Sequence, residues 1–81
     1  MSAPIPLGVI GADRYARAIA DHGAPLPGAR VSRWSPSPCG QDRDGAKTLA
    51  DRVGAEWSPE WETLARDPSL PAVLIRAHYE M

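Results

Sequence analysis

The chain has 81 residues, a formal net charge of −1 and a single cysteine, Cys39. This length allows one small domain, residues 1–81, which buries only about 60 % of the surface that its unfolded chain exposes. The lone cysteine excludes an internal disulfide, the charges form no basic patch, and no apolar run is long enough to span a bilayer. We therefore expect a cytoplasmic protein that binds neither nucleic acid nor membranes.

The first predicted element is a short apolar strand that ends in a glycine. Residues 6–10 predict a buried strand, and Gly11 ends it. Residues 13–22 then have helical spacing, and Gly23 ends this helix. The predicted apolar face of the helix consists of Tyr15, Ala18, Ile19 and His22. A strand, a glycine turn and a helix in this order are typical of the opening of a dinucleotide-binding βαβ unit.

The middle of the chain predicts a second strand and a second helix. Residues 29–34 predict the strand, and the Ser- and Pro-rich residues 35–40 predict a loop. Residues 43–53 predict a helix that ends at Gly54. Its predicted apolar face consists of Ala46, Leu49, Ala50 and Val53.

The last third of the chain predicts two further strands on either side of a third helix. Residues 55–57 predict a short strand, and residues 72–76 an apolar strand of the kind that is buried in parallel sheets. Ser58 as cap and Pro59 at the first position predict the start of the helix between them. The predicted inner face of this helix consists of Trp61, Leu64 and Ala65.

These elements alternate in the order β-α-β-α-β-α-β with short connections. Such an order predicts an α/β fold with right-handed crossovers. The expected architecture is a small open parallel sheet of Rossmann type, with sheet order 3-2-1-4.

Four segments together resemble a known family. They are L-G-V-I-G-A-D-R at residues 7–14, L-P-G-A-R-V at 26–31, A-x-x-L-A-D-R-V-G-A-E at 46–56, and the stretch from Trp57 to Ile75. In order and spacing the chain resembles the N-terminal dinucleotide-binding region of the Gfo/Idh/MocA oxidoreductases. Arg76 and the segment Ser58-Pro59-Glu60 are also similar to the thiazolinyl imine reductase branch.

The resemblance implies NADP or NAD as the cofactor, bound weakly or not at all, and no catalysis by this chain alone. In that family, hydride passes between the nicotinamide and a substrate held by a second domain. The family's Glu-Lys-Pro motif and its substrate domain have no counterpart in residues 1–81, so the chain resembles a truncated domain and no catalytic residue is assigned. The residue types also suggest no metal site, because two distant histidines and one cysteine lack ligand spacing.

Seven residues are candidates for contact with the cofactor. They are Gly11, Ala12, Asp13, Arg14, Trp34, Ser35 and Arg76. Gly11 permits the sharp turn and close approach that a pyrophosphate needs, or it merely ends a strand. The family usually has glycine where Asp13 and Ala16 stand. A carboxylate at Asp13 would cap the helix and occupy the anion site with the protein's own charge.

The other candidates each have a structural alternative. Arg14 could reach a phosphate or lie in solvent. Trp34 could stack on adenine or belong to the core. Ser35 replaces the acid that holds the adenine ribose and so favours NADP over NAD, with Arg33 on the same side of the strand; alternatively it begins a Ser-Pro turn.

Two functions remain open from the sequence. The first is an NAD(P)-binding fragment or shortened relative of a Gfo/Idh/MocA-like oxidoreductase. The second is a non-catalytic interaction protein that regulates a partner enzyme. In both, the fourth strand would be an outer strand with thin protection, so we expect a homodimer or a larger protein partner to contact Val73, Leu74 and Ile75.

Overall fold

The computed structural model describes residues 4–23, 28–38 and 42–76. The elements are β1 (Ile5–Gly11), α1 (Arg14–His22), β2 (Ala29–Ser35), α2 (Arg43–Val53), β3 (Glu56–Trp57), α3 (Trp61–Ala65) and β4 (Ala72–Arg76). The four strands are all parallel and lie in the order β3-β2-β1-β4. This confirms the predicted α/β fold of Rossmann type and its sheet order.

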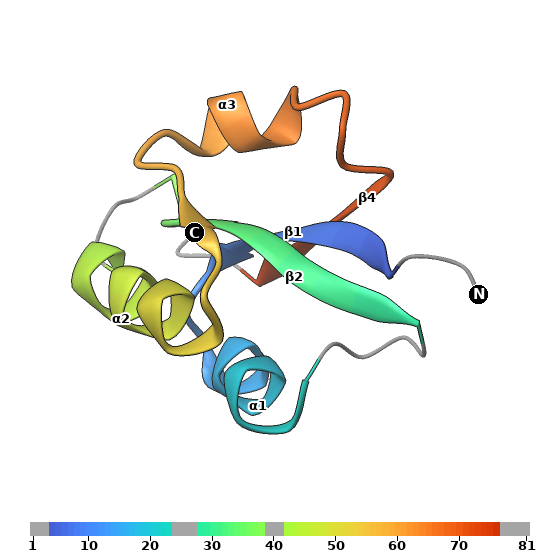
Figure 1. Ribbon diagram of the computed structural model, residues 1–81. Helices are drawn as coiled ribbons and strands as arrows, with labels where there is room; N and C mark the ends of the chain where they lie inside the picture. Colours follow the sequence, from blue (N-terminus) through green and yellow to red (C-terminus); the bar gives the residue numbers. More distant parts are fainter. Residues whose placement is uncertain (1–3, 24–27, 39–41, 77–81) are drawn as a thin grey trace.

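Helices cover both faces of the sheet, but unequally. Figure 1 shows α1 and α2 on one face and α3 on the other. The larger core lies between the sheet and the first two helices, and its buried members are Val9, Ala16, Ile19, Trp34, Ala46, Leu49 and Ala50. In the described part of the chain no helix combines the length and the apolar character needed to cross a bilayer.

The buried face of α1 differs from the predicted one. Ile19 is buried as expected, but Tyr15 is 61 % exposed and Ala18 and His22 are also exposed. Ala16 takes their place as a fully buried member of the core cluster, which also contains residues of α2. The prediction of Tyr15, Ala18 and His22 as core positions is therefore wrong.

The second helix confirms its prediction, and the third one does not. α2 buries Ala46, Leu49 and Ala50, and Gly54 caps its end in the left-handed conformation. By contrast, α3 begins at Trp61, because the Ser58 N–H donates to the Trp34 carbonyl oxygen at 2.8 Å and continues the extended chain. In α3 only Leu64 is buried.

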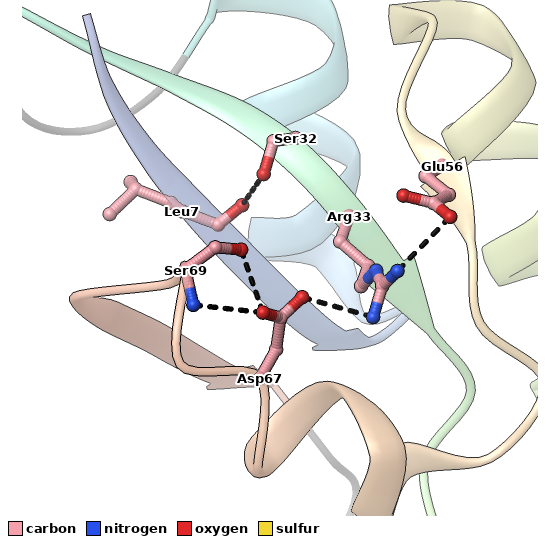
Figure 2. A network of polar contacts seen from close by, with 6 residues as sticks. All are labelled: Leu7, Ser32, Arg33, Glu56, Asp67 and Ser69. Carbon is pink, nitrogen blue, oxygen red and sulfur yellow. Dashed lines mark hydrogen bonds and ion pairs between the residues drawn. The ribbon is translucent and has the colours of Figure 1, made fainter.

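Strand β2 contains an irregularity that decides which side chains reach the core. The register with β1 passes from Leu7↔Val31 to Gly8↔Arg33, so Ser32 is an extra residue. Its hydroxyl donates to the Leu7 carbonyl oxygen at 3.5 Å (Figure 2). As a result Val31 and Trp34, three positions apart, pack against the same core cluster.

Candidate functional site

The candidate site is the turn at the carboxyl end of β1, the central strand beside which β2 and β4 lie on opposite sides. Gly11 has φ of 113°, a conformation that only glycine adopts without strain. The chain reverses there and enters α1 three residues later. Crevices at the carboxyl ends of parallel strands, where the strand order reverses, are where this architecture binds ligands.

Trp34 contacts this turn from the core. Its side chain is fully buried, and its indole Nε1–H donates to the Gly11 carbonyl oxygen at 2.8 Å. A buried indole satisfied by a backbone carbonyl has no exposed ring face for an adenine. Of the two alternatives for Trp34, the structure therefore shows the core one, and its contact with the site is structural.

Asp13 caps the helix that leaves the turn. Its backbone is extended, and its carboxylate Oδ1 accepts a hydrogen bond from the Ala16 N–H at 2.9 Å. This N–H is one of the donors that a pyrophosphate would use at a helix N-terminus. The protein's own carboxylate therefore lies where the positive end of the α1 dipole would attract an anion.

The neighbours of Asp13 line an open surface along the helix. Ala12 is partly buried against the core, and Arg14 is exposed. A hollow of ≈ 560 Å³ follows α1 from Ala12 and Arg14 to Arg17 and His22. Ala16, at the third position of the glycine motif, is fully buried and meets the close-packing requirement of that position.

Ser35 is the one described side chain with a buried polar atom that lacks a partner. The residue is fully buried at the end of β2, opposite Ile10 of β1, and its Oγ makes no hydrogen bond. Buried hydroxyls are nearly always satisfied, so an orphan of this kind indicates a missing water or ligand group or a cost in stability. The sequence predicts Ser35 as the first residue of the loop at residues 35–40; in the structure it is the last residue of β2.

Arg33 is engaged elsewhere and does not lie free beside Ser35. Figure 2 shows its guanidinium between two carboxylates, with Nη2 3.0 Å from Glu56 and Nη1 3.0 Å from Asp67. Asp67 in turn accepts hydrogen bonds from the hydroxyl and the N–H of Ser69, at 2.7 and 2.9 Å. These bonds to Ser69, together with the charge of Arg33, lower the pKa of Asp67.

Arg76 reaches the same edge of the sheet through the backbone. Its Cα is the partner of Gly11 in the β1–β4 register. Gly11, Asp13, Ser35 and Arg76 thus all lie at the carboxyl edge. Sequence reasoning missed one contact there, the hydrogen bonds that the N–H and hydroxyl of Ser37 donate to Asp42 at 2.9 Å. Asp42 stands just before a predicted helix, but its carboxylate accepts from Ser37 and makes no cap bond to the helix, so the capping pattern does not predict this contact.

No protein-family model matches the chain, and no curated protein matches it in sequence. A similar solved structure is a protein from Desulfitobacterium hafniense DCB-2 described as a "putative NADPH-dependent oxidoreductase". The two share 18 % identity with a TM-score of 0.70, over 93 % of this chain and 20 % of that one. The chain thus spans about a fifth of the length of that protein, and at this identity the likeness establishes the fold alone.

Proposed function

We propose that this chain is the cofactor-binding part of an oxidoreductase of Gfo/Idh/MocA type, and that it binds NADP(H) weakly without catalysing hydride transfer alone. The observation that carries the proposal is the Gly11 turn at the end of the central strand in a sheet of order β3-β2-β1-β4. The similarity of this fold to that of the Desulfitobacterium protein supports the proposal. The assignment to the thiazolinyl imine reductase branch of that family rests on Ser58-Pro59-Glu60 and Arg76 alone.

The residues at the carboxyl edge fit the adenosine half of such a cofactor. Gly11 makes the sharp turn that a pyrophosphate approaches, and Ser35, fully buried at the end of β2, stands where the resemblance places the acid that holds the adenine ribose. No carboxylate stands at Ser35 to repel a 2′-phosphate, so NADP(H) is favoured over NAD(H). When bound, the nicotinamide would supply hydride chemistry, which the seven candidate residues do not perform themselves.

Asp13 is expected to weaken the binding of NADP(H). Its carboxylate accepts the Ala16 N–H and adds negative charge at the helix end that a pyrophosphate would approach. We therefore expect dissociation constants on the order of 100 µM or weaker for NADPH, and weaker still for NADH.

Calorimetric titration of the purified chain with NADPH and NADH tests the proposal. The decisive variant is Asp13→Asn, because asparagine keeps the cap while it removes the charge. We expect it to bind NADPH about two- to fivefold more tightly than the unaltered chain. Asp21→Asn is the matched control, since Asp21 lies in the last turn of α1, 2.9 Å from Arg52. It should leave the affinity unchanged.

The same titration decides between the two functions. No heat at millimolar NADPH with either the unaltered chain or Asp13→Asn would refute cofactor binding. That result would favour the second candidate, an interaction protein that kept the fold and lost the site. The observation that favours this candidate is that Asp13 fills the anion position with its own side chain.

A further inference from the structure

Strand β4 is an outer strand, and its face opposite Leu74 is only partly covered. It pairs with β1 on one side, and no strand lies on its other side among the described residues. Leu74 packs against the core below α1 and α2. Because side chains alternate along a strand, Val73 and Ile75 point to the opposite face. Ile75 is 58 % exposed there.

On this face Ile75 is exposed, whereas Val73 is partly buried. Helix α3 lies on the same face as Val73 and Ile75, but it packs against β1 and β2 (Figure 1). Residues 72–75 contain no charge, and Pro71 protects only the start of the strand. An uncharged outer strand with an exposed branched side chain is a template for pairing with another strand.

We propose that two copies of this chain pair through β4, antiparallel about a two-fold axis at Leu74. In this register Leu74 faces the partner's Leu74, and Val73 faces the partner's Ile75. Directly opposed residues point to the same face, so four branched side chains form one apolar cluster across the axis. The two sheets become one sheet of eight strands.

The occupant is a second copy because the strand complements itself in this register. Arg76 faces the partner's Ala72, so no like charges oppose each other across the pair. All five residues of β4 find a partner, whereas a shift toward Pro71 would place a residue without an N–H in the ladder. The net charge of −1 opposes association only weakly.

The size of the contact sets its strength. One pair of five-residue strands buries less surface than the standard interface of about 1,600 Å². The dimer should therefore be reversible, with a dissociation constant on the order of 10–100 µM.

Sedimentation equilibrium of the purified chain from about 1 to 500 µM tests the proposal. We expect the average mass to rise from monomer toward dimer across this range. Ile75→Lys should weaken the dimer at least about tenfold. Ile5→Lys is the matched control, because Ile5 is 51 % exposed at the start of β1, and it should change the constant less than about twofold. A chain that remains monomeric throughout, or equal effects of both variants, would overturn the proposal.

A cysteine series tests the register and does not depend on affinity. In a Cys39→Ser background, Leu74→Cys places two thiols directly opposite each other, with Cα atoms about 5 Å apart, within disulfide range. Val73→Cys places them diagonally, about 7–8 Å apart. Mild oxidation should therefore link Leu74→Cys at least about tenfold faster than Val73→Cys. Equal rates for the two variants would refute the register.

Discussion

Two buried serines near the end of β2 differ in one respect, the partner of the hydroxyl. Ser35 has none among the described residues, whereas the Ser37 hydroxyl donates to Asp42 at 2.9 Å. Ser35→Ala removes an unsatisfied polar group, so it should leave the free energy of unfolding unchanged or raise it by about 1 kcal/mol. Ser37→Ala, the matched control, should lower it by about 1 kcal/mol. Urea unfolding of the three proteins measures both effects.

The opposite result is equally informative at this site. Equal losses in the two serine variants would show that the Ser35 hydroxyl has a partner in solution, such as an ordered water.

The sequence predicts the helix cap at Asp13 but leaves Trp34 undecided between the core and the site, for physical reasons. A helix cap depends on local hydrogen bonds, and Asp13 accepts from a residue three positions away. The side on which Trp34 lies depends on the extra residue Ser32 in β2. Simple alternation would place Val31 and Trp34 on opposite faces, and nothing in the local sequence marks the irregularity.

At the scale of the elements, Gly8 sets how closely α3 approaches β1. A Cβ built at Gly8 would lie 2.7 Å from Leu64 Cδ2 and 2.9 Å from Leu70 Cδ1. Leu64 is fully buried and has little room to move. Gly8→Ala should therefore lower the free energy of unfolding by about 1–3 kcal/mol, through overpacking.

A glycine in α2 provides the control for this substitution. A Cβ at Gly45 would lie 3.6 Å from the Ala12 Cβ, an ordinary contact. Gly45→Ala should therefore raise the free energy of unfolding by about 0.5–1 kcal/mol, since alanine favours the helix. The two variants are compared by urea unfolding, and a neutral Gly8→Ala would show that α3 can lift from the sheet at little cost.

Both wrong helix predictions have the same origin, the competition between local pattern and tertiary contact. In α1 the small residue Ala16 is fully buried in the core cluster while the larger Tyr15 is exposed, because the packing of the core, and not side-chain hydrophobicity, decides which face of the helix is buried. In α3 the strong start signal at Ser58 yields to its hydrogen bond with Trp34. The order and type of all seven elements were predictable, because apolar runs and glycine stops mark them along the chain.

At the scale of the whole molecule, α3 is held on its face of the sheet by polar contacts as well as by the burial of Leu64. Arg33 of β2 forms an ion pair with Asp67, which follows α3, and Asp67 accepts a hydrogen bond from Ser69, which precedes β4 (Figure 2). These three residues therefore connect the helix to the sheet on the side where the apolar core is smallest.

This connection should make stability depend on pH in the acid range. The hydrogen bonds from Ser69, and then the charge of Arg33, lower the pKa of Asp67 below its ordinary value of 3.8. A carboxylate with a lowered pKa contributes stability that is full above pH 3.8 and is lost as the pH falls through the folded-state value. Asp67→Asn should therefore be less stable than the unaltered chain at neutral pH, and the difference should shrink below that point. Ser69→Ala removes the largest cause but keeps the Ser69 N–H bond and the ion pair with Arg33, so it should lose part of the same pH dependence. Chemical unfolding of all three proteins between about pH 7 and 2.5 measures this, and a difference that stays constant across the range would show that Asp67 does not link the fold to protonation.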